Sequence, residues 1–199
     1  MKKLEFIIGI DEVGRGPIAG PVAVGAFVFL KPEARKFFKG VRESKQLTEQ
    51  KRKEWFERIL LAQKFEHIDF AVSFQSEEVI DEKGISFAIK KCIEMSLKKL
   101  IIFIDLANTL ILLDGGLKAS PEYKNQKTII KGDEKEMIIA LASICAKVLR
   151  DRKMKILAKT YTGYGFELHK GYGTKKHYEA INKYGLCPIH RRSFITNYS

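Results

Sequence analysis

The stretch Gly9-Ile10-Asp11-Glu12-Val13-Gly14-Arg15-Gly16-Pro17 carries most of the information in this chain about fold and chemistry. An apolar run at residues 6–8 precedes it and predicts a buried strand that ends at two adjacent carboxylates. Such a pair resists burial unless a cation or a shared proton relieves the repulsion. The glycines let the backbone approach a ligand, and their amides with Arg15 suit an anion. The stretch therefore favours a metal-dependent nuclease site.

Two observations weaken this interpretation when the stretch is taken alone. An acidic pair beside glycine is also common in solvated turns. In a regular strand, neighbouring side chains point to opposite faces, so Asp11 and Glu12 cannot both reach one ion there. They can do so only if the strand ends or twists at this point, which Gly14 permits without requiring it.

The composition is that of an ordinary soluble domain with an excess of positive charge. The 199 residues are 45% hydrophobic and 30% charged, which is enough for a single domain with a sizeable core. The formal net charge of +12 favours a polyanionic partner, usually nucleic acid and less often an acidic membrane surface. A basic surface that serves only solubility is the remaining alternative.

Cysteine usage and hydropathy indicate a cytoplasmic protein. Cys92, Cys145 and Cys187 are far apart, which argues against a disulfide framework or a zinc site and for a reducing compartment. The longest apolar stretch, residues 100–113, is shorter than the roughly 20 residues of a membrane span. We therefore expect no association with a membrane.

Periodicity predicts an α/β chain with a helical C-terminal appendage. We expect residues 1–160 to form the main domain and residues 161–199 to pack on it, as a single compact unit. The predicted strands are residues 6–8, 22–30, 68–75, 110–113 and 128–130. The predicted helices start near Thr48 (with Trp55, Phe56, Ile59 and Leu60 on its apolar face), Ser76, Ile85 and Thr174, and a long helix carries Ile138 to Leu149.

Acidic residues follow three of the predicted strands. Asp11 and Glu12 end the first, Asp114 ends a later one, and Asp133 follows another. Acids at the ends of different strands can converge on one point, and four carboxylates without His or Cys suit Mg²⁺ or Mn²⁺. Asp105 is the rival of Asp114, which we prefer because a glycine follows it.

A series of motifs in this order is similar to bacterial ribonuclease HII. The resemblance covers nearly the whole chain, and its C-terminal motifs are the most specific. The motifs are residues 9–17 with Ala19-Gly20-Pro21, Ser44-Lys45 with Leu47, Leu113-Asp114-Gly115, Lys131-Gly132-Asp133, Ala142-Ser143-Ile144, Ala146-Lys147-Val148, Arg150-Asp151-Arg152, Gly163-Tyr164-Gly165-Phe166, His169-Lys170-Gly171-Tyr172-Gly173-Thr174, and Pro188-Ile189-His190-Arg191-Arg192-Ser193-Phe194.

The resemblance implies an RNase H-like mixed sheet flanked by helices. It also implies an endonuclease that uses two Mg²⁺ or Mn²⁺ ions on RNA–DNA hybrids and on duplex DNA with an embedded ribonucleotide. The cut would fall 5′ of the ribonucleotide and leave 3′-hydroxyl and 5′-phosphate ends. The expected roles are removal of ribonucleotides and RNA primers during DNA repair and replication, by a monomer.

The resemblance also assigns roles to residues of this chain. Tyr172 would stack on the sugar at the RNA–DNA junction, with Tyr164 as the alternative, because the 2′-hydroxyl is the local group that distinguishes RNA from DNA. The other implied residues are the carboxylates Asp11, Glu12, Asp114 and Asp133, of which the first three are the expected metal ligands, the turn Gly14, Arg15 and Gly16 against the 2′-hydroxyl and phosphate, and Ser44 and Lys45 on a phosphate.

The sequence departs from the family pattern at a few positions, none of them among the four acids. Glu43 and Gln46 replace the usual aspartate and lysine of the phosphate-binding loop, and Gly116 replaces a polar residue. Two other functions remain as hypotheses. One is a nucleic-acid-binding module without catalysis, and the other is a strand-transfer or junction-resolving enzyme that would cut pure DNA.

Overall fold

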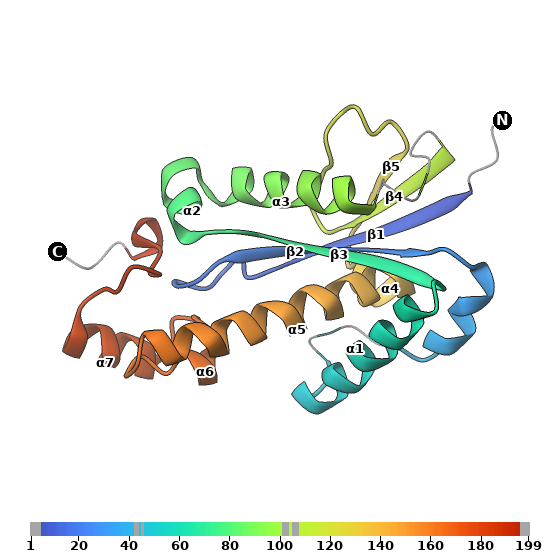
Figure 1. Ribbon diagram of the computed structural model, residues 1–199. Coiled ribbons are helices and arrows are strands. Elements are labelled where there is room, and N and C mark those ends of the chain that lie inside the picture. Colours follow the sequence, from blue (N-terminus) through green and yellow to red (C-terminus); the bar gives the residue numbers. More distant parts are fainter. Residues whose placement is uncertain (1–4, 42–43, 45, 101–103, 105–107, 196–199) are drawn as a thin grey trace.

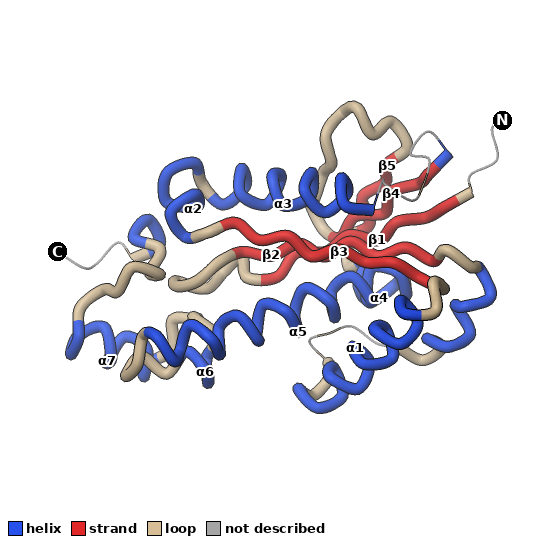
Figure 2. Tube along the Cα trace, in the orientation of Figure 1, coloured by secondary structure: helices blue, strands red, loops and turns tan. Residues whose placement is uncertain are grey.

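The computed structural model describes residues 5–41, 44, 46–100, 104 and 108–195. A five-stranded mixed sheet forms its centre, between two layers of helices (Figure 2). The strand order is β3-β2-β1-β4-β5. β1 pairs antiparallel with β2 and parallel with β4, so the central strand joins an antiparallel half to a parallel half. The strands are β1 (Phe6–Val13), β2 (Val22–Phe29), β3 (Ile68–Gln75), β4 (Thr109–Asp114) and β5 (Gln126–Ile129).

Helices cover both faces of this sheet, as Figure 1 shows. α2 (Glu77–Lys83) and α3 (Ile85–Leu100) lie on one face, and α1 (Glu49–Lys64) and α5 (Met137–Thr160) on the other. Thr48 and Ser76 accept hydrogen bonds at the starts of α1 and α2, as their positions in the sequence predict. Within the described residues, the other helices are η1 (Pro32–Phe38), α4 (Gly132–Lys135), α6 (Phe166–His169), α7 (Lys175–Tyr184) and η4 (Arg192–Phe194).

The long helix α5 packs directly on the two central strands because glycines face it. A Cβ atom on Gly9 would lie 2.4 Å from the carbonyl oxygen of Ile138, and one on Gly25 would lie 2.2 Å from that of Ala142. Such distances are far inside van der Waals contact. Gly25 pairs with Asp11 across β1 and β2, so this close packing brings α5 to the acidic stretch.

The C-terminal segment packs on the chain just after β1. Ile18 and Ala19 share an apolar cluster with Met154, Phe166 and Ile181. Ala19 forms a β-bridge with His190, and the Arg191 amide donates to the Ile18 carbonyl at 2.8 Å. The helical C-terminal appendage is therefore confirmed as an element of the fold, whereas the division at residue 160 stays a prediction.

Three predictions from the sequence differ in detail from the structure. β1 continues to Val13, so Asp11 and Glu12 lie inside the strand and not beyond its end. Ile130 lies outside β5 and is 75% exposed. Leu60 is exposed as well, because the buried stripe of α1 is formed by Phe56, Ile59 and Ala62.

Cys92, Cys145 and Cys187 are free and buried, and burial raises the pKa of each thiol. Within the described ranges, no helix combines the length and apolar character that crossing a bilayer requires.

Candidate active site

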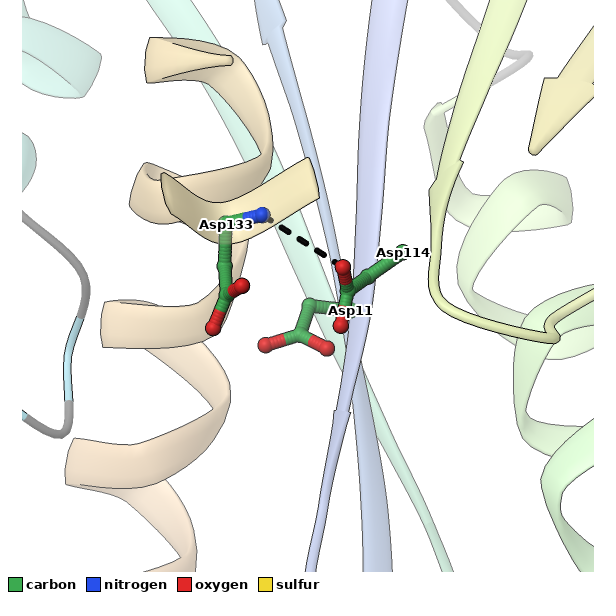
Figure 3. A group of neighbouring side chains, drawn as sticks. All are labelled: Asp11, Asp114 and Asp133. Atoms are coloured by element: carbon green, nitrogen blue, oxygen red, sulfur yellow. Dashed lines mark hydrogen bonds between the residues drawn. The ribbon is translucent and has the colours of Figure 1, made fainter. Parts of the chain in front are cut away.

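Three aspartates from separate elements meet at one point beside the centre of the sheet. Asp11 comes from β1, Asp114 from the end of β4, and Asp133 from α4, as Figure 3 shows. Each offers a carboxylate oxygen, and the three oxygens lie within 4.8 Å of one another. The structure thus brings together acids that are 122 residues apart along the chain (133 minus 11).

Backbone amides fix the Asp114 carboxylate at the start of α4. The Gly132 amide donates to Asp114 Oδ1 at 2.6 Å, and the Asp133 amide donates to the same oxygen at 3.4 Å (Figure 3). Lys131 precedes them with a left-handed backbone, φ 55°, which turns the chain from β5 into this short helix. The segment that carries Asp133 therefore also fixes the carboxylate of Asp114.

The electrostatics of the cluster fit a divalent cation. Asp11 is 4% exposed, and burial is the largest cause that raises the pKa of its carboxyl well above the usual value. A hydrogen bond from Ser143 opposes this rise, whereas the charges of Glu12, Asp114 and Asp133 add to it. Clustered carboxylate oxygens without nitrogen or sulfur donors match the preference of Mg²⁺ and Mn²⁺, so the residues present fit such an ion.

Ser44 lies behind Asp11, away from the protein surface. Its hydroxyl is 2.7 Å from that of Ser143, and Ser44 is only 2% exposed. The geometry therefore links Ser44 through Ser143 to Asp11 and does not favour direct contact of Ser44 with a phosphate. Lys45 and Asp105 lie outside the described residues.

Glu12 faces the opposite side of the sheet from Asp11. It pairs with Val24, whose side chain packs under α3, and it borders a hollow with Lys90 and Lys118. Its carboxylate accepts a hydrogen bond from Arg15 Nε at 3.0 Å. Among the predicted acids, Glu12 is the one that stays outside the aspartate cluster.

The Gly14-Arg15-Gly16 turn lies on the surface next to β1. Gly14 has φ +94°, a conformation that favours glycine, and a Cβ there would lie 2.2 Å from Arg150 Nε. The Arg15 side chain is 53% exposed. The turn thus has a charged outer side and a buried arginine directly beneath it.

Tyr172 lies beside this turn, and Tyr164 does not reach the surface. A Cβ on Gly16 would be 3.9 Å from the Tyr172 ring, and Tyr172 is 44% exposed. Tyr164 is 8% exposed, stacks on Phe166 and donates to the Gly185 carbonyl at 2.9 Å. Of the two candidate tyrosines, only Tyr172 offers its ring to a bound molecule.

A chain of hydrogen bonds through two buried histidines holds the backbone of Tyr172. His177 Nδ1 faces the Tyr172 carbonyl at 2.8 Å, so it must be the donor. His190 Nε2 then donates to His177 Nε2 at 3.1 Å, and the Cys187 amide donates to His190 Nδ1 at 2.9 Å. Burial lowers the pKa of His177 to about 4 and lowers that of His190, so both rings are neutral at pH 7.

Among the residues that support the site from behind, sequence reasoning missed the role of Ser143. Ser143 lies on the buried, apolar face of α5. A small polar residue among the apolar residues of such a face is the signal in the sequence that could have identified it. His177 and His190 are buried, and their rings pack against each other. Arg150 and Arg191 are fully buried, which a basic sequence motif does not reveal.

The fold and site together define a class. An aspartate cluster at the centre of a mixed sheet, beside an exposed arginine turn on a strongly basic chain, is the arrangement of a metal-dependent nuclease. The family model described as Ribonuclease HII matches residues 8–197, so the chain belongs to the ribonuclease HII family. It is accordingly an endonuclease of ribonuclease H type, a family that acts on RNA–DNA hybrids.

Individual relatives agree with this assignment. The chain is 45% identical over 192 residues to a Ribonuclease HII of Clostridioides difficile, covering 96% of this chain and 71% of the relative. It is similar to the crystal structure of ribonuclease H2 from Pyrococcus horikoshii, with a TM-score of 0.69, 25% identity and coverage of 95% and 93%. A Bst-RNase HIII structure in complex with Mn²⁺ has a TM-score of 0.65 at 20% identity, covering 92% of this chain and 64% of that one. The expected RNase H-like fold is confirmed.

Proposed function

We propose that this endonuclease cuts duplex DNA at embedded ribonucleotides as well as RNA–DNA hybrids, on the 5′ side of the ribonucleotide. The products carry 3′-hydroxyl and 5′-phosphate ends. The observation that carries the proposal is the position of an exposed aromatic ring, Tyr172, beside the Gly14-Arg15-Gly16 turn. These groups can test a sugar for its 2′-hydroxyl without reading the base.

Asp11, Asp114 and Asp133 are the residues that would hold the divalent ions, Mg²⁺ or Mn²⁺, on the α5 side of the sheet. When bound, two such ions supply the Lewis acidity that activates water and stabilises the leaving oxygen of a phosphodiester. Ser143 orients the Asp11 carboxylate, and the amides of Gly132 and Asp133 orient that of Asp114. The Mn²⁺ complex of the related RNase HIII supports this choice of ion.

Glu12 is the fourth member of the proposed catalytic set, and binding of the substrate would change its ion pair with Arg15. It holds Arg15 at 3.0 Å, and a phosphate bound at the turn would compete for the same guanidinium. Release of Arg15 would then leave the Glu12 carboxylate as an unpaired negative charge beside the turn, across the sheet from the three aspartates. Lys45 completes the proposed phosphate contacts, with Ser44 supporting the site from inside.

A matched pair of duplexes tests the proposed specificity. One carries a single ribonucleotide and the other has the same sequence in DNA alone. Mg²⁺-dependent cleavage of the first, with a 5′-phosphate on the fragment that begins with the ribonucleotide, supports the proposal. Cleavage of the all-DNA duplex would indicate a strand-transfer or junction-resolving enzyme. Binding without cleavage would indicate a module that only binds nucleic acid.

The biological role follows from this specificity. An enzyme that opens duplex DNA at ribonucleotides serves their removal during repair and the removal of RNA primers during replication. Cytoplasmic location and a monomeric state stay predictions. The net charge of +12 supports a polyanionic substrate, because neutralised phosphates release counterions.

A further inference from the structure

Arg191 holds the Gly14-Arg15-Gly16 turn from inside the protein. Its guanidinium donates from Nη2 to the Gly14 carbonyl at 2.8 Å and from Nη1 to the Arg15 carbonyl at 3.1 Å. Its Nε donates to the Gly20 carbonyl at 2.8 Å. One side chain from the C-terminal segment therefore holds three carbonyl groups of the segment that follows β1.

Burial of the Arg191 guanidinium costs free energy, so its hydrogen bonds to the backbone must compensate for the lost hydration. Arg191 is 0% exposed, and among the described residues no carboxylate comes within ion-pair distance of it. A buried charge without an ionic partner is unfavourable unless hydrogen bonds satisfy it, and here backbone carbonyls do so. Only arginine offers a rigid planar fork that reaches all three carbonyls together, since lysine is a flexible point donor.

The fork determines where the amides of the turn point. In a trans peptide unit, the C=O and the following N–H point in opposite directions. Because the Gly14 and Arg15 carbonyls point inward to Arg191, the N–H groups of Arg15 and Gly16 point away from it. Within the described residues, neither N–H donates to a protein acceptor. The turn thus presents two adjacent amide donors next to the Tyr172 ring.

Arg191 is itself fixed by its neighbours. Its own amide donates to the Ile18 carbonyl at 2.8 Å, and its guanidinium lies 5.2 Å from the centre of the Phe194 ring. His190, the preceding residue, belongs to the hydrogen-bond chain that holds the Tyr172 carbonyl. Adjacent residues of the C-terminal segment therefore support both the turn and the aromatic ring.

We propose that Arg191 is a positioning residue for ribonucleotide recognition, because it directs the amides of Arg15 and Gly16 toward the sugar-phosphate group that Tyr172 contacts. This rests on the proposed function. Arg191 does not touch the substrate, and its contribution is to selectivity and affinity for the ribonucleotide rather than to the bond-breaking step.

The test compares Arg191→Lys with Arg192→Lys. The second substitution is the matched control, because it makes the same change at the adjacent residue, keeps the charge and affects an exposed residue. Both full-length variants are assayed with the single-ribonucleotide duplex and with its all-DNA counterpart. Arg191→Lys is expected to raise KM about 10-fold or more while kcat changes less than about 3-fold. The affinity of Arg191→Lys for the ribonucleotide duplex is expected to fall toward its affinity for the all-DNA duplex. For Arg192→Lys, both KM and the ratio of the two affinities should stay within about 2-fold of the wild type.

Amide resonances of the wild-type protein provide a second measurement that does not depend on folding of the variant. The ¹⁵N signals of Arg15 and Gly16 should shift when the ribonucleotide duplex binds in Ca²⁺, and shift much less with the all-DNA duplex. The proposal is overturned if those signals do not respond, or if folded Arg191→Lys keeps the wild-type KM and selectivity. If the wild type itself shows no ribonucleotide preference, the proposed function fails instead.

Discussion

Asp11 and Glu12 are adjacent in the sequence but lie on opposite faces of the sheet. Asp11 faces α5 and joins Asp114 and Asp133, whereas Glu12 faces α3 and pairs with Arg15. The cause is that β1 continues to Val13, so its side chains still alternate at this point. The two carboxylates therefore have different partners in the free protein, and this difference can be measured.

Asp11→Asn should abolish cleavage and leave binding of the duplex largely intact. The substitution removes a charge from the cluster without changing its volume, so we expect cleavage to fall more than about 1,000-fold, about 4 kcal/mol of transition-state stabilisation. Initial rates with Mg²⁺ and fluorescence anisotropy of the labelled duplex measure the two properties. Retained full activity would refute the assignment of the site.

Glu12→Gln should separate ion binding from catalysis. Because Glu12 lies outside the aspartate cluster, the affinity for Mn²⁺ without nucleic acid should stay within about 3-fold of the wild type, whereas cleavage should fall about 10-fold or more. Isothermal titration with Mn²⁺ gives the first quantity, with Asp114→Asn as the control that weakens binding. A Glu12→Gln protein that loses Mn²⁺ as Asp114→Asn does would show that Glu12 is already a ligand in the free protein.

Ser143→Ala should weaken the ion site without touching an acid. The Ser143 hydroxyl is hydrogen-bonded to Asp11, and losing such a support for a ligand costs about 10-fold in metal affinity. Ser44→Ala is the matched control, because it removes the other hydroxyl of the pair and leaves Ser143 to orient Asp11. Equal Mn²⁺ affinities for the two variants would contradict the role given to Ser143.

His177 should make the stability depend on pH below neutrality. Its pKa is lowered from 6.5 to about 4 in the folded protein, so between these values the unfolded chain binds more protons. Stability is therefore complete above about pH 6.5 and is lost as the pH falls toward about 4, by roughly 1–3 kcal/mol from this group. Urea unfolding between pH 4 and 7 should show a shallower dependence for His177→Asn than for the wild type.

Two substitutions of His177 separate the effects of its two ring hydrogen bonds, one to the Tyr172 carbonyl and one to His190. Asparagine places its amide nitrogen where His177 Nδ1 lies and can keep the bond to the Tyr172 carbonyl, whereas glutamine matches Nε2 and keeps only the bond to His190. His177→Asn should therefore retain more ribonucleotide preference than His177→Gln. The reverse order would show that support of Tyr172 does not pass through this bond.

Gly25→Ala should be strongly destabilising, because its Cβ would enter the space of the Ala142 carbonyl of α5. Overpacking of a helix against a strand at this distance predicts a loss of about 3 kcal/mol or more. Gly116→Ala is the control, since a Cβ there meets nothing within 4 Å and its φ is not in the left-handed region. Denaturant unfolding of both variants should show a loss for the first and a change near zero for the second.

Much of the fold could be predicted because local patterns determine it. β3 has the predicted bounds, and the caps at Thr48 and Ser76 are where the sequence places them. The strand order could not be read from the sequence in the same way. It depends on which face of each strand packs against α3 or α5, and glycines such as Gly9 and Gly25 decide this through the close approach they permit.

The candidate site was predictable in part for the same reason. Asp11, Asp114 and Asp133 could be found because each comes shortly after an apolar run in the sequence. The position of Glu12 could not be determined, because it depends on whether β1 ends one residue earlier or later. The supporting residues Ser143 and Arg191 depend on packing between distant segments, which no local pattern records.

Anomalous diffraction from a crystal soaked in Mn²⁺ tests the central claim most directly. The account predicts a manganese peak at bonding distance from carboxylate oxygens of Asp11, Asp114 and Asp133 together. A soaked crystal with no manganese peak at this position would contradict it. So would a peak near the cluster if one of the three aspartates pointed its side chain away from the ion.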